Sequence, residues 1–84
     1  MDLRELAEDI LSIYEDMDTY ELKDTFNDKK EAYDFIFYAL RKWSAEDIRE
    51  SIINNLQKFI DDGYGTKQMA DVIQRLNELA EARE

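Results

Sequence analysis

Carboxylates are the residues of this chain that could do chemistry. The 84 residues include 21 Asp and Glu against 11 Lys and Arg, for a formal net charge of −10. The excess is concentrated in residues 1–26, where nine acidic residues accompany only Arg4 and Lys23. Such carboxylates could ligate a metal ion, act as a paired acid and base, or bind a basic surface. Their spacing and their neighbours distinguish these three chemistries.

The spacing of the oxygen-bearing side chains around residues 60–71 does not fit a calcium site. The segment 62–66, Asp-Gly-Tyr-Gly-Thr, looks like the middle of an EF-hand loop. If Gly65 is the glycine that such a loop requires, Ile60 and Tyr64 occupy the first and fifth ligand positions, where oxygen ligands are needed. Asp71 would then stand in place of the final bidentate Glu. We therefore expect a plain turn between helices, with no metal and no other cofactor.

Catalysis lacks its usual groups. The chain contains no His and no Cys, so the commonest general base and the thiol nucleophile are both absent. Neighbouring carboxylates would lie on exposed helix faces, where nothing shifts their pKa. The segment 64–67, Tyr-Gly-Thr-Lys, is too short for a phosphate-binding loop. We expect that the protein is not an enzyme and has no catalytic residues.

The acidic face of the first predicted helix is the main candidate for a binding site. Seven carboxylates from Asp2 to Asp18 span about 24 Å, roughly one per 3.5–4 Å, close to the ~3.4 Å phosphate spacing of one DNA strand. Most amphipathic helices pair Glu with Lys four residues away, and this helix has almost no such pairs. The competing interpretation is that the charges only aid solubility. The candidate partner-binding residues are Glu5, Glu8, Asp9, Glu15, Asp16 and Asp18.

This acidic face favours a protein partner with a basic groove. In composition and size the chain is similar to small acidic proteins that imitate DNA and block nucleases, restriction enzymes, CRISPR effectors or repressors. The hypothesis is an inhibitor of the phage or mobile-element anti-defence type, which occupies the groove of a nucleic-acid-binding protein. Direct binding to nucleic acid or to an anionic membrane is disfavoured, because both would repel the net charge of −10.

An aromatic face on the second main helix is the alternative binding site. Aromatic and basic residues are enriched in protein interfaces. This face predicts a helical adaptor or regulatory subunit that docks through an apolar-aromatic surface, or a homodimer. The competing interpretation is that the rings are simply the core of a bundle. The candidate residues are Tyr33, Phe37 and Tyr38, beside Lys30, Arg41 and Lys42.

Helices must position both faces, and the sequence is permissive for helix almost throughout. It has no proline and only two glycines. Start signals with capping spacing occur at Asp2, Asp28 and Ser44, and Thr66 can cap a further helix. Gly63 is a natural left-handed C-cap. The predicted helices are 2–17, 28–43, 45–62 and 67–82, with an additional short helix at 19–26.

The apolar pattern predicts the fold class. Each main helix has an apolar stripe at helical spacing, and 84 residues make one domain. We expect an all-α fold, a compact bundle of four main helices in a single domain, 1–84. In the second main helix the stripe predicted to be buried is Ala32, Phe35, Ile36, Ala39, Leu40 and Trp43.

The sequence favours a cytoplasmic location. The absence of cysteine fits a reducing compartment. Acidic residues in 1–16 occupy the place where a signal peptide needs a basic and then an apolar run. The longest apolar run, 35–40, is too short to cross a bilayer.

Overall fold

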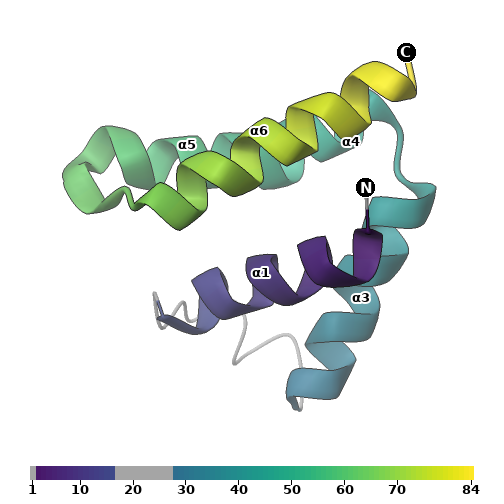
Figure 1. Ribbon diagram of the computed structural model, residues 1–84, viewed down its shortest axis with the longest axis horizontal. Helices are drawn as coiled ribbons and strands as arrows, with labels where there is room; N and C mark the ends of the chain where they lie inside the picture. Colours follow the sequence, from purple (N-terminus) through teal and green to yellow (C-terminus); the bar gives the residue numbers. More distant parts are fainter. Residues whose placement is uncertain (1, 17–27) are drawn as a thin grey trace. The chain divides into compact units, whose positions relative to one another are not determined.

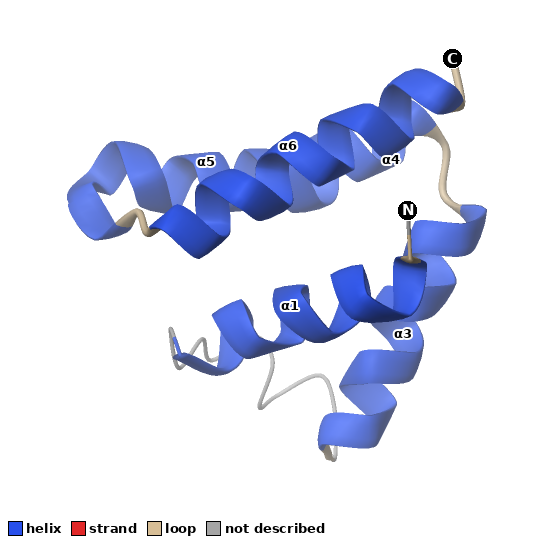
Figure 2. Cartoon of the chain, viewed as in Figure 1, coloured by secondary structure: helices blue, strands red, loops and turns tan. Residues whose placement is uncertain are grey.

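The computed structural model describes residues 2–16 and 28–84, and these residues form helices joined by turns, with no strand among them (Figure 2). The predicted all-α class with four main helices is confirmed. The chain divides into two compact units, Met1–Lys42 and Trp43–Glu84. The single domain therefore stays a prediction. The short helix predicted at 19–26 lies outside the described residues.

The described residues of the first unit form two helices. α1 spans Leu3–Asp16 and packs against α3, which spans Lys29–Lys42 (Figure 1). Both helices are amphipathic, so each buries one stripe of side chains and leaves its charged residues outside. The buried side chains are Leu6, Ala7, Ile10 and Ile13 of α1 and Ala32, Ile36, Ala39 and Leu40 of α3.

The second unit is a helical hairpin. Its first arm comprises α4 (Ala45–Ile48), the π-helical segment η1 (Arg49–Ile53), α5 (Asn54–Phe59) and η2 (Ile60–Tyr64). The helical backbone of this arm stops at Gly63, within η2, where φ is 95° and ψ is 5°. Its second arm is α6 (Lys67–Ala82), which packs along α4, η1 and α5 (Figure 1). The sequence predicted the first arm as one ordinary α-helix, and the two π-helical segments are a difference. The largest fully buried side chains of this unit are Ile48, Leu56, Val72 and Leu76.

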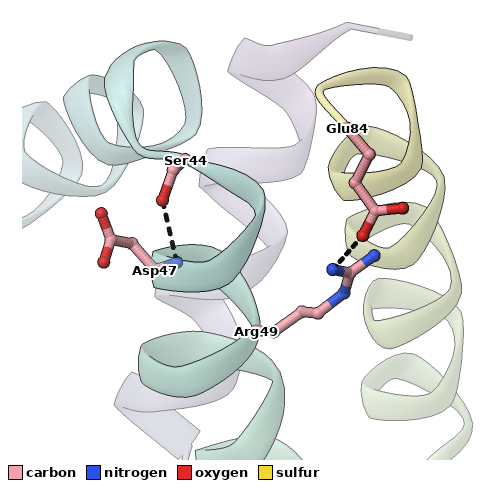
Figure 3. Close-up of polar contacts among 4 residues, drawn as sticks. All are labelled: Ser44, Asp47, Arg49 and Glu84. Atoms are coloured by element: carbon pink, nitrogen blue, oxygen red, sulfur yellow. Dashed lines mark hydrogen bonds and ion pairs between the residues drawn. The ribbon is translucent and has the colours of Figure 1, made fainter.

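Side-chain caps begin the helices where the sequence predicted them. The Asp28 carboxylate accepts a hydrogen bond from the Glu31 N–H at 2.8 Å, and the Thr66 hydroxyl accepts one from the Met69 N–H at 3.1 Å. The Ser44 hydroxyl accepts a bond from the Asp47 N–H at 3.2 Å (Figure 3). The remaining cap is Asp2, whose carboxylate accepts a hydrogen bond from the backbone N–H of Arg4 at 2.9 Å.

The open end of the hairpin is tied by polar contacts. The Arg83 guanidinium donates a hydrogen bond to the Trp43 carbonyl oxygen at 2.6 Å. Arg49 forms an ion pair with Glu84, which joins η1 to the residues that follow α6 (Figure 3). These contacts hold the two ends of a 42-residue unit together, in addition to its apolar core.

The predicted burial of Phe35 is wrong. Its side chain is 46% exposed, whereas the other stripe residues Ile36 and Leu40 are buried. α3 carries apolar residues nearly all round, so its hydrophobic pattern does not define which side faces α1. Ala32 and Ala39, from the same predicted stripe, are buried as expected.

Candidate partner-binding surfaces

The acidic face of α1 keeps part of its predicted charge exposed to solvent. Glu5, Glu8 and Asp16 are exposed, and Asp9 is half-buried. Asp18, the sixth predicted residue, lies outside the described residues. The described carboxylates from Asp2 to Asp16 extend over about 21 Å of the helix. The base on this helix is Arg4, which is also exposed.

Glu15 is engaged within the protein. Its Oε2 lies 3.2 Å from the Nζ of Lys29, at the start of α3. Its Oε1 is buried and has no hydrogen-bond partner among the described residues. The sequence showed almost no bases at helical spacing on α1, but the partner of Glu15 comes from a different helix. Glu15 is therefore less available to an external partner than the exposed residues Glu5, Glu8 and Asp16.

The three predicted aromatic residues do not form one surface. Tyr33 and Phe37 stack on each other, with ring centroids 6.0 Å apart and planes at 6°. The Arg41 guanidinium carbon lies 5.4 Å from the centre of the Phe37 ring, a cation–π contact. Both stacked rings are half-buried. Tyr38 lies about 100° around the helix from Phe37, so it belongs to another face.

Tyr38 shares its face with Phe35, a residue that the sequence assigned to the core. Tyr38 is 57% exposed and Phe35 is 46% exposed. They are three residues apart, so their side chains lie on the same side of α3. Two large exposed rings on one helix face are typical of an interaction surface. The only signal in the sequence was the excess of apolar residues in α3 over what one buried stripe needs.

The described residues hold no group of three or more acidic side chains that could bind a metal ion. None of the helices in residues 2–16 and 28–84 is both long and apolar enough to cross a membrane. No family model matches the chain, and searches of curated proteins and of solved structures find no significant similarity.

Proposed function

We propose that the protein is a small acidic inhibitor that binds another protein through the outer face of α1. The observation that carries this proposal is the exposure of Glu5, Glu8 and Asp16 on one helix that has a single base. Like charges on one helix repel each other and reduce its stability, so a binding role would account for their presence. The proposal places the protein in the cytoplasm, where it would meet enzymes that act on nucleic acid.

The partner proposed is a nucleic-acid-binding protein or nuclease whose basic groove accepts the α1 face in place of a phosphate backbone. Electrostatic complementarity of this kind accelerates association and is screened by salt. Binding should therefore weaken steeply as ionic strength rises, and duplex DNA should compete for the same groove.

The test compares charge reversals on two helices. Immobilised protein captures partners from a lysate, and the bound fraction is eluted first with duplex DNA and then with salt. We expect Glu5→Lys with Glu8→Lys to lower the affinity for the DNA-eluted partner by about tenfold or more, since the groove would meet like charge. Glu78→Lys with Glu81→Lys on α6 makes the same change in net charge and should preserve capture.

Two results would contradict the proposal. One is equal loss of capture with the α6 reversal, which would show that only the net charge matters. The other is capture of DNA-eluted partners that survives the reversal on α1.

The exposure of Tyr38 and Phe35 favours a second candidate, a helical adaptor or regulatory subunit that docks through an apolar-aromatic face. Its partner should stay bound at high salt and should be lost with Tyr38→Ala. Phe37→Ala is less suitable as a test, because Phe37 is half-buried and its loss would disturb the fold.

A further inference from the structure

Asp62 is followed by Gly63, and no other aspartate or asparagine of the chain has a glycine after it. In such a pair the backbone nitrogen of the glycine can attack the side-chain carboxyl carbon of the aspartate and close a five-membered imide ring. A side chain on the second residue hinders this attack, and glycine has none. The attack is hindered at Asp34, Asp47 and Asp71, which precede Phe, Ile and Val.

Water has access to the pair. Asp62 and Gly63 are both exposed, and so are the other residues from 61 to 68. Nothing lies within 4 Å of the position that a Cβ on Gly63 would occupy, so the space beside this residue is open. The neighbouring Asp61 differs in two respects: its carboxylate accepts a hydrogen bond from the Gln57 side chain at 3.1 Å, and the residue after it is not glycine.

The helical backbone ends at this pair, in the turn that joins the two arms of the hairpin (Figure 1). Ring closure requires a rotation of the backbone between Asp62 and Gly63 out of the helical conformation. An aspartate in the middle of a helix is held against this rotation by helical turns on both sides, whereas Asp62 has such a turn only before it. The end of a helix opens at a much lower free energy than the whole fold. Ring closure therefore needs only a local opening of the turn.

We propose that Asp62–Gly63 is a site of spontaneous covalent modification, at which the folded protein forms a succinimide and then an isoaspartate. The Asp62 carboxyl group reacts in its protonated form. A bond forms between the Gly63 nitrogen and Asp62 Cγ, and the bond from Cγ to the carboxyl hydroxyl breaks. That hydroxyl and the amide proton leave together as one water molecule.

Solvent water then opens the ring at one of two bonds. Cleavage between Cγ and the Gly63 nitrogen restores aspartate. Cleavage between the main-chain carbonyl carbon of Asp62 and the same nitrogen gives isoaspartate, so the chain now continues through the former side chain. The water taken up equals the water released, and no atom is oxidised or reduced.

Isoaspartate lengthens the main chain by the β-carbon of Asp62 and keeps the net charge. The turn has little room for this extra carbon, because a Cβ on Gly65 would already lie 2.9 Å from Ile60 Cγ1. The purified isoaspartate form should therefore have a folded-to-unfolded ratio about tenfold lower than the original chain. Modification would thus weaken the turn of the hairpin as the protein ages.

Incubation of the full chain in buffer at constant pH and temperature tests the proposal. A protein isoaspartyl methyltransferase with labelled S-adenosylmethionine counts the isoaspartate formed. Digestion by a protease that cleaves before aspartate locates it, because this protease does not cleave before isoaspartate. We expect isoaspartate to accumulate at residue 62, with a succinimide peptide that is lighter by one water molecule. A wild type that accumulates none at this residue would overturn the proposal.

Matched variants test the chemistry. Asp62→Glu keeps the charge and the glycine but would need a six-membered ring, so it should lower the rate of isoaspartate formation by about tenfold or more. Asp61→Glu makes the same change one residue earlier and should leave the rate within about twofold of wild type. If Asp62→Glu forms isoaspartate as fast as wild type, the site lies elsewhere and the proposal is wrong.

A core variant tests whether the reaction occurs in the folded state. Val72 is fully buried, so Val72→Ala should raise the unfolded fraction by about tenfold or more, which urea unfolding measures on the same sample. Reaction through local opening should leave the rate within about threefold of wild type. A rate that rises in proportion to the unfolded fraction would show that only the unfolded chain reacts, and it would overturn the proposal.

Discussion

Gly63 lies within η2 and Gly65 lies between η2 and α6, and the two glycines are needed for different physical reasons. Gly63 has a φ of 95° and a ψ of 5°, the left-handed conformation that ends many helices. Nothing lies within 4 Å of the position that a Cβ on Gly63 would occupy. Gly65 has a φ of −67°, which any residue can adopt, but a Cβ there would lie 2.9 Å from Ile60 Cγ1 and 3.2 Å from Ile60 Cα.

This difference predicts distinct substitution patterns. Gly63→Ala should lower the free energy of unfolding by about 1 kcal/mol through backbone strain, and Gly63→Asn by less, since Asn tolerates the left-handed region. Gly65→Ala should lower the free energy of unfolding by about 1–3 kcal/mol through steric overlap. Gly65→Asn should lower it by at least as much, because its side chain is larger. Urea unfolding followed by circular dichroism measures all four. If Gly63→Asn and Gly65→Asn lowered the free energy of unfolding equally, backbone strain at Gly63 and steric overlap at Gly65 would not be the distinct causes.

Among the helices, the caps make the clearest local contribution. Thr66 and Ser44 each satisfy a backbone N–H that the helix itself leaves without an acceptor. Thr66→Ala and Ser44→Ala should each lower the free energy of unfolding by about 1 kcal/mol.

The matched control for the caps is Ser51→Ala, on the exposed surface of η1. Alanine has the higher helix propensity, so this change should be neutral or slightly stabilising. The urea midpoints of the three variants provide the comparison, provided that the dependence of the unfolding free energy on urea concentration is unchanged. A loss at Ser51 as large as at Thr66 would show that capping is not the cause.

For the molecule as a whole, the net charge of −10 is the dominant electrostatic feature. The ion pairs Lys29–Glu15, Arg49–Glu84 and Arg75–Asp71 are exposed or partly exposed, so each contributes little to stability. Mutual repulsion of the carboxylates should outweigh them. The thermal midpoint should therefore rise as NaCl increases from about 0.01 to 0.5 M, as the Debye length falls from about 30 Å to less than 8 Å.

Calorimetry at constant, low protein concentration measures this dependence. A midpoint that falls with added NaCl would mean that attractive ion pairs outweigh the repulsion.

The sequence was sufficient wherever the controlling interactions are local. A cap joins residues two or three positions apart, so Asp2, Asp28, Ser44 and Thr66 were identifiable from spacing. The left-handed conformation of Gly63 and the helical spacing of the apolar residues also depend on residues close in the chain. They were sufficient to predict the all-α class.

Contacts between residues distant in the chain depended on the packing of the helices. The bond from Arg83 to the Trp43 carbonyl joins residues 40 positions apart, and Lys29 reaches Glu15 from another helix. No local pattern specifies such pairs. The exposure of Phe35 depended on packing too, because α3 is apolar on more than one side and only its docking against α1 selects the side that is buried. That selection left Phe35 and Tyr38 exposed together, a face that composition and period alone could not assign.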